Sequence, residues 1–148
     1  MRSISATATA SDTASRLRLA VARLARLLRQ QSTEGEITVS MLSALASVER
    51  LGPVALGELA AVERVQPPSL TRIVGRLEEL GLVARAADPA DRRIVRVSPT
   101  PEGTRLLARN RRRRDAFLAE RMQLLNPDEV AAVEAALPVL ERLLEGDR

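Results

Sequence analysis

The chain has 148 residues, 45% of them hydrophobic, which is enough for one domain with a hydrophobic core. Cys, His, Trp and Tyr are absent and Phe occurs once, which excludes thiolate and imidazole metal sites, cysteine-based redox sensing and aromatic stacking on single-stranded nucleic acid. The net charge is +4, and because Lys is absent every basic residue is Arg, whose planar guanidinium suits phosphate and guanine. A GC-rich coding genome would account for this arginine usage almost as well.

A long amphipathic helix is predicted over residues 13–31, where five arginines occupy positions outside an apolar stripe. The stripe consists of Leu17, Ala20, Val21, Leu24, Leu27 and Leu28. Residues 1–12 lack the apolar stretch of a signal peptide, and no segment approaches the ~18 consecutive apolar residues of a membrane span. We therefore expect a cytoplasmic protein that makes no membrane contact.

Two shorter helices are predicted next. The first begins near Thr38 and stops at Gly52-Pro53. Its inward positions are Met41, Leu42, Leu45 and Val48. The second covers about residues 56–62 and packs through Leu59 and Ala60 against the helix that follows.

That following helix has two chemically different faces. Pro67 and Pro68 suit its first turn, and Gly81 ends it at a position that commonly needs positive φ. The apolar stripe consists of Leu70, Ile73, Val74, Leu77 and Leu80. The opposite face carries Ser69, Arg72 and Arg76 near the helix N-terminus, where hydrogen bonds to base edges and phosphates are geometrically feasible.

A β-hairpin is predicted after this helix, with residues 82–86 and 93–97 antiparallel around the turn at 88–91. Together the helix and hairpin form a recognition helix with a β-wing. The same periodicity also fits a stabilising helix and an ordinary hairpin with solvated arginines. The local charge favours the DNA-binding interpretation, because residues 64–76 hold three arginines and no acid.

Two helices are predicted to complete the chain. Thr100 caps the first, which continues through residues 105–125, and the sequence Asn126-Pro127-Asp128-Glu129 starts the second, which ends near Leu144. Pro138 should kink the last helix or remove one hydrogen bond. This helix carries more apolar surface than a lone terminal helix should expose, so we expect a partner to cover it: Val130, Val133, Leu137, Leu140, Leu143 and Leu144.

Four consecutive arginines, residues 111–114, point all round their helix rather than along one face. Contact with DNA phosphates is the less favoured interpretation. Pairing with the acidic residues 126–148, which hold six acids and two arginines, is favoured.

The motifs resemble a MarR-type winged helix-turn-helix transcription regulator, over roughly residues 38–103. LGELAAVERVQPPSLTR resembles the two-helix DNA-binding unit of that family, and RLEELGLVAR resembles the end of its recognition helix with the first wing strand. DPADRR followed by VSPTPEG resembles its wing and the start of the next helix.

The resemblance implies a mainly α fold with a small β-wing in a single MarR-type chain, residues 1–148. Residues 38–98 would form the winged helix-turn-helix part, and residues 12–34 and 100–146 a helical dimerisation part built by the N- and C-terminal helices. A homodimer would place two recognition helices about 34 Å apart, as successive major grooves of an inverted-repeat operator in double-stranded DNA require.

The helix pattern, together with the resemblance for the wing, gives the residues expected to contact DNA. On the recognition helix and at its start we expect Gln66, Pro68, Ser69, Thr71, Arg72 and Arg76. In the wing, Asp91 would brace the loop while Arg93 enters the minor groove.

An effector, by the same resemblance, would be a small phenolic or aromatic acid bound where the dimer helices meet the winged domain. An apolar wall of Met41, Leu42 and Leu45 beside Arg16 would suit it, but these residues also fit plain core and surface positions.

Three residues depart from the family pattern. Arg64 and Gln66 stand where the turn between the two helices usually has Gly and a small hydroxyl cap. Since Gln is a poor N-cap, either the helix start is less well fixed or Gln66 is retained to contact a base. Pro99 replaces an aliphatic residue and lacks a backbone donor, so the second wing strand is expected to stop by Ser98.

The sequence thus predicts a DNA-binding transcription regulator, with a repressor the commoner case in the family, that is released by a small ligand. The alternative is a winged-helix module that binds only protein. No catalytic function is expected, because Ser and the acids are scattered and no nucleophile–base pair is visible. No cofactor or metal is expected.

Overall fold

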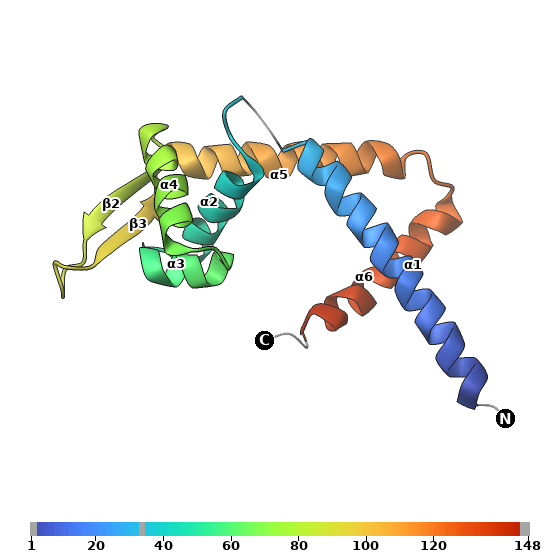
Figure 1. Ribbon diagram of the computed structural model, residues 1–148. Helices are drawn as coiled ribbons and strands as arrows, with labels where there is room; N and C mark the ends of the chain where they lie inside the picture. The colour runs from blue at the N-terminus through green and yellow to red at the C-terminus, as the bar shows by residue number, and fades with distance from the viewer. Residues whose placement is uncertain (1–2, 33–34, 146–148) are drawn as a thin grey trace. The chain divides into compact units, whose positions relative to one another are not determined.

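The computed structural model describes residues 3–32 and 35–145, with side chains from residue 10 onward. Its helices are α1 (Ser3–Gln30), α2 (Val39–Leu51), α3 (Leu56–Glu63), α4 (Pro67–Glu79), α5 (Pro101–Met122) and α6 (Pro127–Glu145). Its strands are β1 (Val54–Ala55), β2 (Val83–Ala87) and β3 (Val95–Pro99) (Figure 1). The mainly helical fold with a small β-wing is the one predicted. None of the helices in the described ranges is both long enough and apolar enough to span a membrane.

The chain divides into two compact units, residues 1–113 and 114–148, and the boundary falls within α5. The first unit holds α1 to α4, the sheet and the first part of α5. The second unit holds the end of α5 and all of α6.

Helix α1 begins at Ser3, well before the Thr13 expected from the leucine pattern. Its first turns are rich in Ala, Ser and Thr and contain neither Gly nor Pro, so nothing in them breaks a helix even though they lack an apolar stripe. At the other end, the Ser32 hydroxyl donates to the Leu28 carbonyl at 2.9 Å.

Helices α2 and α3 lie where the sequence predicted. The Thr38 hydroxyl caps α2 by accepting the Met41 amide at 3.2 Å, and Gly52 ends that helix with φ 73°. Strand β1 was not predicted, because two residues are too few to show an alternating pattern. It adds a third strand to the expected hairpin and gives the order β1-β3-β2.

The hydrophobic core joins α2, α3, α4 and the sheet in the first unit. Leu70, Val74 and Leu77 of α4 expose at most 1% of their surface, as their helical spacing predicts. They pack in one cluster with residues that include Leu45, Val48, Leu59, Val83, Val97 and Leu106. This core fixes the exposed face of α4 and the base of the wing.

The second wing strand extends to Pro99, so the expected stop at Ser98 is wrong. The Thr100 amide donates to the Leu82 carbonyl at 3.0 Å, which makes the neighbouring pair Val83 and Pro99 a non-hydrogen-bonded pair of the antiparallel ladder. The missing donor of Pro99 would therefore point away from β2. On that side β1 pairs only with Val97 and Arg96, so no hydrogen bond is lost.

Helix α5 starts as predicted, with the Thr100 hydroxyl accepting the Gly103 amide at 3.1 Å. It ends at Met122 rather than continuing to Leu125, because the Leu124 and Leu125 amides bond three residues back and tighten the chain into a turn.

Helix α6 has the predicted capping box. The Asn126 side chain accepts the Glu129 amide and the Glu129 carboxylate accepts the Asn126 amide, both at 2.9 Å. The helix continues through Pro138 to Glu145, and none of its residues is buried.

Candidate nucleic-acid interface

The Gln66 side chain does not cap the N-terminus of α4. Gln66 is the N-cap residue, with φ −66° and ψ 140°, and its side chain makes no capping hydrogen bond. The backbone does the capping, since the Gln66 carbonyl accepts the Ser69 and Leu70 amides at 3.0 and 3.1 Å. Pro67 and Pro68 occupy the first helical positions, where no amide donor is needed.

Arg64 adopts a left-handed backbone conformation, for which glycine is the usual residue in this turn. It ends α3 with φ 54° and ψ 39°, in the left-handed region that L-residues with side chains rarely adopt. Its amide nevertheless bonds back to the Ala61 carbonyl at 3.2 Å, which completes the end of α3.

The predicted contact residues of α4 and its cap all lie on the surface, while the opposite stripe is buried. The exposed set is Gln66, Pro68, Ser69, Thr71, Arg72 and Arg76. The Thr71 hydroxyl donates to the Pro67 carbonyl at 2.9 Å, so its oxygen still has lone pairs for a further donor. A polar, hydrogen-bonding face is thus held on a helix whose other side is anchored in the core.

Arg76 differs from its neighbours because two carboxylates hold its guanidinium. Glu79, one turn on, lies 2.7 Å from Nη1, and Glu36, from the segment between α1 and α2, bonds Nη2. The hydrogen bond to Glu79 is the main cause of the raised pKa of Arg76, followed by the charge of Glu36. Residues 64–76 contain no acid, but these two carboxylates from outside that range make this end of α4 less positive than the sequence predicted.

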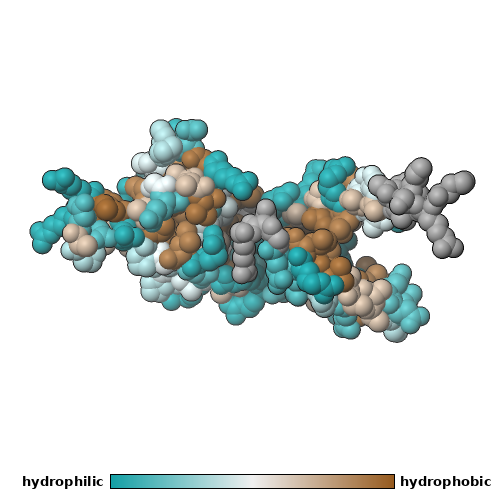
Figure 2. Space-filling view, turned by 90° about the horizontal axis from the view of Figure 1, so that it is seen from below, coloured by the Kyte–Doolittle hydropathy of each residue, from teal (hydrophilic) through white to brown (hydrophobic). Residues whose placement is uncertain are grey.

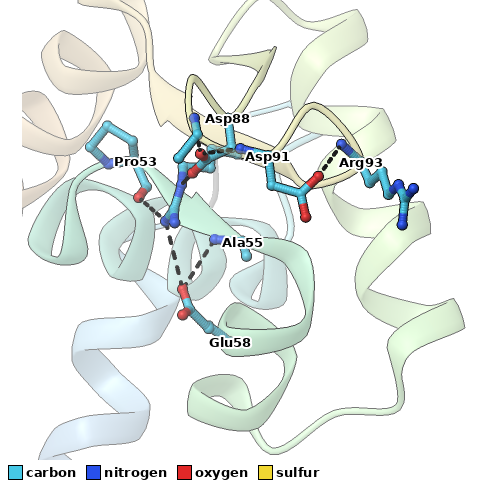
Figure 3. Close-up of polar contacts among 8 residues, drawn as sticks. Pro53, Ala55, Glu58, Asp88, Asp91 and Arg93 are labelled. Atoms are coloured by element: carbon cyan, nitrogen blue, oxygen red, sulfur yellow. Dashed lines mark hydrogen bonds and ion pairs between the residues drawn. The ribbon is translucent and has the colours of Figure 1, made fainter.

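The wing loop, residues 88–94 between β2 and β3, presents Arg93 outward, and Asp91 helps to fix its backbone. An Asp91 carboxylate oxygen accepts the Arg93 amide at 3.0 Å, and the Asp91 carbonyl accepts the Ile94 amide at 2.9 Å. The Arg93 guanidinium points away from the other labelled residues in Figure 3. Hydrophilic side chains cover the far end of the wing, at the left of Figure 2.

Asp88 was not singled out from the sequence, yet it is the buried residue of the wing loop. One carboxylate oxygen accepts the Ala90 and Asp91 amides at 2.7 and 3.1 Å, and the other accepts Nε of Arg96. The Arg96 hydrogen bond, followed by the two amides, lowers the pKa of Asp88. The Asp-Pro turn pattern signalled the local amide bonds, whereas the partner on the next strand left no local signal.

Arg96 connects the wing to the start of α3. Besides binding Asp88, its guanidinium donates from Nη1 to the Pro53 carbonyl at 3.1 Å (Figure 3). The same Nη1 lies 4.0 Å from the Glu58 carboxylate, which also accepts the Ala55 amide at 3.3 Å at the α3 N-terminus. The hydrogen bond to Asp88 is the main cause of the raised pKa of Arg96.

The arginine run in α5 corrects one expectation. Arg111 pairs with Glu49 of α2 through Nη1 at 2.9 Å, and this contact raises the pKa of Arg111. Pairing of Arg111 with the acidic C-terminal residues was therefore the wrong interpretation. Sequence distance hid the partner, since Glu49 lies 62 positions before Arg111.

The effector candidates occupy two kinds of environment. Met41, Leu42 and Leu45 lie in the hydrophobic core, each at most 4% exposed. Arg16 lies on the exposed side of α1, and it lines a surface hollow together with Thr13, Leu17 and Ala20.

A polar recognition-helix face beside a hairpin with an outward arginine defines a winged helix-turn-helix protein. A sequence profile described as "MarR family" matches residues 37–95. An HTH-type transcriptional regulator of Mycobacterium tuberculosis is 40% identical over 132 residues, covering 89% of this chain and 92% of the relative. The multiple antibiotic resistance protein MarR of Salmonella typhimurium is 32% identical over 113 residues, covering 76% and 78%.

The fold comparison agrees. A Pseudomonas aeruginosa protein of known crystal structure has a TM-score of 0.82 and 37% identity, over 92% of this chain and 96% of that one. The chain belongs to the MarR family of transcriptional regulators.

Proposed function

We propose that this regulator binds an inverted-repeat operator in double-stranded DNA as a homodimer, represses transcription there, and is released by a small-molecule effector. The observation that carries the proposal is the wing: Arg93 is exposed and its guanidinium points outward, while its own amide is fixed by Asp91. A guanidinium presented in this way fits the narrow, negatively charged minor groove of DNA.

The roles of the other residues follow from their chemistry. Ser69, Thr71 and Gln66 supply donors and acceptors for base edges or phosphates, and Pro68 packs against the sugar–phosphate backbone. Arg72 suits a bidentate contact with guanine or phosphate. Asp91 acts on the loop backbone rather than on DNA, because a carboxylate facing phosphate would be repelled.

Dimerisation is supported by the uncovered apolar side chains of α6. Leu137, Leu143 and Leu144 expose 50%, 64% and 75% of their surface. A second copy is the partner with the best rationale, because a two-fold axis matches the symmetry of an inverted repeat. Repression is supported by a Bacillus subtilis relative, 28% identical over 121 residues, that is named as the transcriptional repressor MdtR.

Effector release requires a ligand that binds the DNA-free state more tightly than the DNA-bound state. The exposed Arg16 guanidinium on α1, beside Leu17 and Ala20, supplies a positive charge with which the carboxylate of an aromatic acid would pair. Thermal shift measurements against a panel of phenolic and aromatic acids test this part, with Arg16→Ala as the control variant. If no compound stabilises the wild-type protein, this part of the proposal fails.

Selection of binding sites from a random duplex library, followed by salt titration, tests DNA binding. We expect an inverted repeat with half-sites about one helical turn apart, and an affinity that falls steeply as salt rises, since counterions are released from phosphates. Failure to enrich any duplex at low salt would favour the alternative, a winged-helix module that binds only protein.

The Arg93→Ala variant tests the wing. We expect affinity for the selected duplex to fall on the order of tenfold, with an unchanged melting temperature, because the side chain is exposed. Arg105→Ala removes an arginine of α5 that pairs with Glu102 at 2.9 Å, and it serves as the matched control. Equal affinities of Arg93→Ala and wild type for the duplex would show that the wing does not contact DNA through Arg93.

A further inference from the structure

We infer that Arg96 is a positioning residue for DNA binding: its guanidinium clamps the wing loop to the β1–α3 junction and so sets where Arg93 is presented. The inference rests on the proposed function, and it assigns a role to a side chain that need not touch DNA. Four features of the structure support it.

First, the tip of the wing has no hydrophobic anchor. Among residues 88–94, Asp88 alone is buried, and every other residue, including Ile94 at 38%, is exposed. Apolar packing therefore cannot define the conformation of the loop. Polar contacts must do so. Two backbone bonds close the loop, from the Asp88 amide to the Ile94 carbonyl and from the Ile94 amide to the Asp91 carbonyl, and the Asp88 carboxylate binds two further loop amides.

Second, these contacts form a continuous chain from Arg96 to Arg93. Arg96 binds one oxygen of Asp88, and the other oxygen accepts the Ala90 and Asp91 amides. The Asp91 side chain then accepts the Arg93 amide at 3.0 Å. Each link is a hydrogen bond to an ionised carboxylate, which is a stronger and more directional bond than one between neutral groups.

Third, the other end of the chain is anchored outside the hairpin. Arg96 lies on the central strand, opposite Ala55 of β1 and Ala86 of β2. Its Nη1 donates to the Pro53 carbonyl at 3.1 Å and lies 4.0 Å from Glu58, the residue that caps α3. The clamp thus ties the wing loop to the helix that precedes the recognition helix.

Fourth, the geometry requires a guanidinium and not merely a positive charge. Nε faces Asp88 while Nη1 faces Pro53 and Glu58, so one planar group bonds in two directions at fixed spacing. A lysine ammonium carries the same charge but cannot reproduce this two-sided arrangement. Arg96→Lys is therefore the informative substitution, because it preserves the charge that phosphates would attract.

The test is a double-mutant cycle with Arg93→Ala on the duplex selected by the wild-type protein. We expect Arg96→Lys to weaken binding about tenfold with an unchanged salt slope, and to weaken it less than about twofold in the Arg93→Ala background. Arg109→Lys, which alters a guanidinium paired with Glu102 at 3.2 Å on α5, is the control and should leave affinity unchanged. Wild-type affinity of Arg96→Lys, or additive losses in the double variant, would overturn the inference.

Amide hydrogen exchange in the free protein separates this inference from the proposed function. In Arg96→Lys we expect faster exchange at Ala90 and Asp91, whose amides bond to Asp88, and unchanged exchange in α4. If the wild-type protein binds no duplex, the proposed function fails, while the exchange rates still test the clamp. Unchanged exchange at both amides would show that Arg96 does not hold the loop.

Discussion

Helices α4 and α6 carry similar apolar stripes but differ in what covers them. In α4 the stripe residues Leu70, Val74 and Leu77 are completely shielded by the core of the first unit. In α6 no residue is buried, and Leu143 and Leu144 expose more than half of their surface. Helical periodicity therefore identifies the apolar face of a helix but not what covers that face. The core of the first unit buries the stripe of α4, whereas no described residue of α6 is buried.

The largest expected effect comes from the same substitution in the two helices. Leu77→Ala should lower the free energy of unfolding by about 2–5 kcal/mol, because it empties a fully packed site. Leu143→Ala should change the stability of the isolated monomer by less than about 0.5 kcal/mol, since that side chain is 64% exposed. Urea unfolding at several protein concentrations measures both.

Leu143→Ala has a second expected consequence, which is weaker self-association in analytical ultracentrifugation. The opposite outcome is that Leu143→Ala destabilises the protein as much as Leu77→Ala at every concentration. That result would mean that α6 is covered within its own chain.

A smaller effect is expected where α5 meets the base of the wing. A Cβ atom on Gly103 would lie 2.1 Å from the Leu82 carbonyl oxygen, a backbone atom that cannot move aside easily. Gly103→Ala should therefore cost about 1–3 kcal/mol of stability. Gly57→Ala in α3 is the matched control, because its Cβ would meet nothing within 4 Å and Ala favours helix. Equal melting temperatures of the two variants would contradict the close approach.

Some features of the structure could be predicted from the sequence, and others could not. Local signals sufficed for the start of α2 near Thr38, for the helix caps at Thr100 and Asn126 and for the positive φ of Gly81, because each depends on neighbours a few residues away. The same holds for the buried stripe of α4, whose inward face follows from its spacing.

Contacts between distant residues could not be predicted in this way. Glu36 reaches Arg76 across 40 positions and Glu49 reaches Arg111 across 62, so a window of neighbouring residues contains only one partner of each pair. Strand β1 and the Asp88–Arg96 pair depend likewise on how the chain folds back on itself. The exposed residues of α4 and the brace at Asp91 were predicted from pattern and resemblance, whereas Asp88 and Arg96, which also hold the wing loop, were not.

The pH dependence of stability tests the polar anchor of the winged unit. Because the pKa of Asp88 is lowered from its ordinary value of 3.8, its ionised form stabilises the fold above that value, and this contribution is lost as the pH falls through the folded-state pKa. Wild type should lose stability more steeply below about pH 4 than Asp88→Asn does. Urea midpoints measured between pH 6 and about pH 2.5 give the two curves.

Glu102, whose pKa is lowered by Arg105 and Arg109, titrates in both proteins, so the difference between the curves isolates Asp88. Parallel curves for wild type and Asp88→Asn would show that ionisation of Asp88 does not stabilise the wing loop.

The smallest expected effect concerns the exposed face of α4. Glu36→Gln should strengthen DNA binding about two- to fivefold, because it frees the Arg76 guanidinium from one carboxylate and makes it available to a phosphate. Glu49→Gln removes the same charge beside Arg111 of α5 and is the matched control for net charge. Titration of the selected duplex at two salt concentrations distinguishes the cases. A steeper salt slope in Glu36→Gln alone would show that Arg76 gains a phosphate contact. Equal gains in affinity in both variants would show that overall charge causes the effect and that Arg76 does not contact DNA.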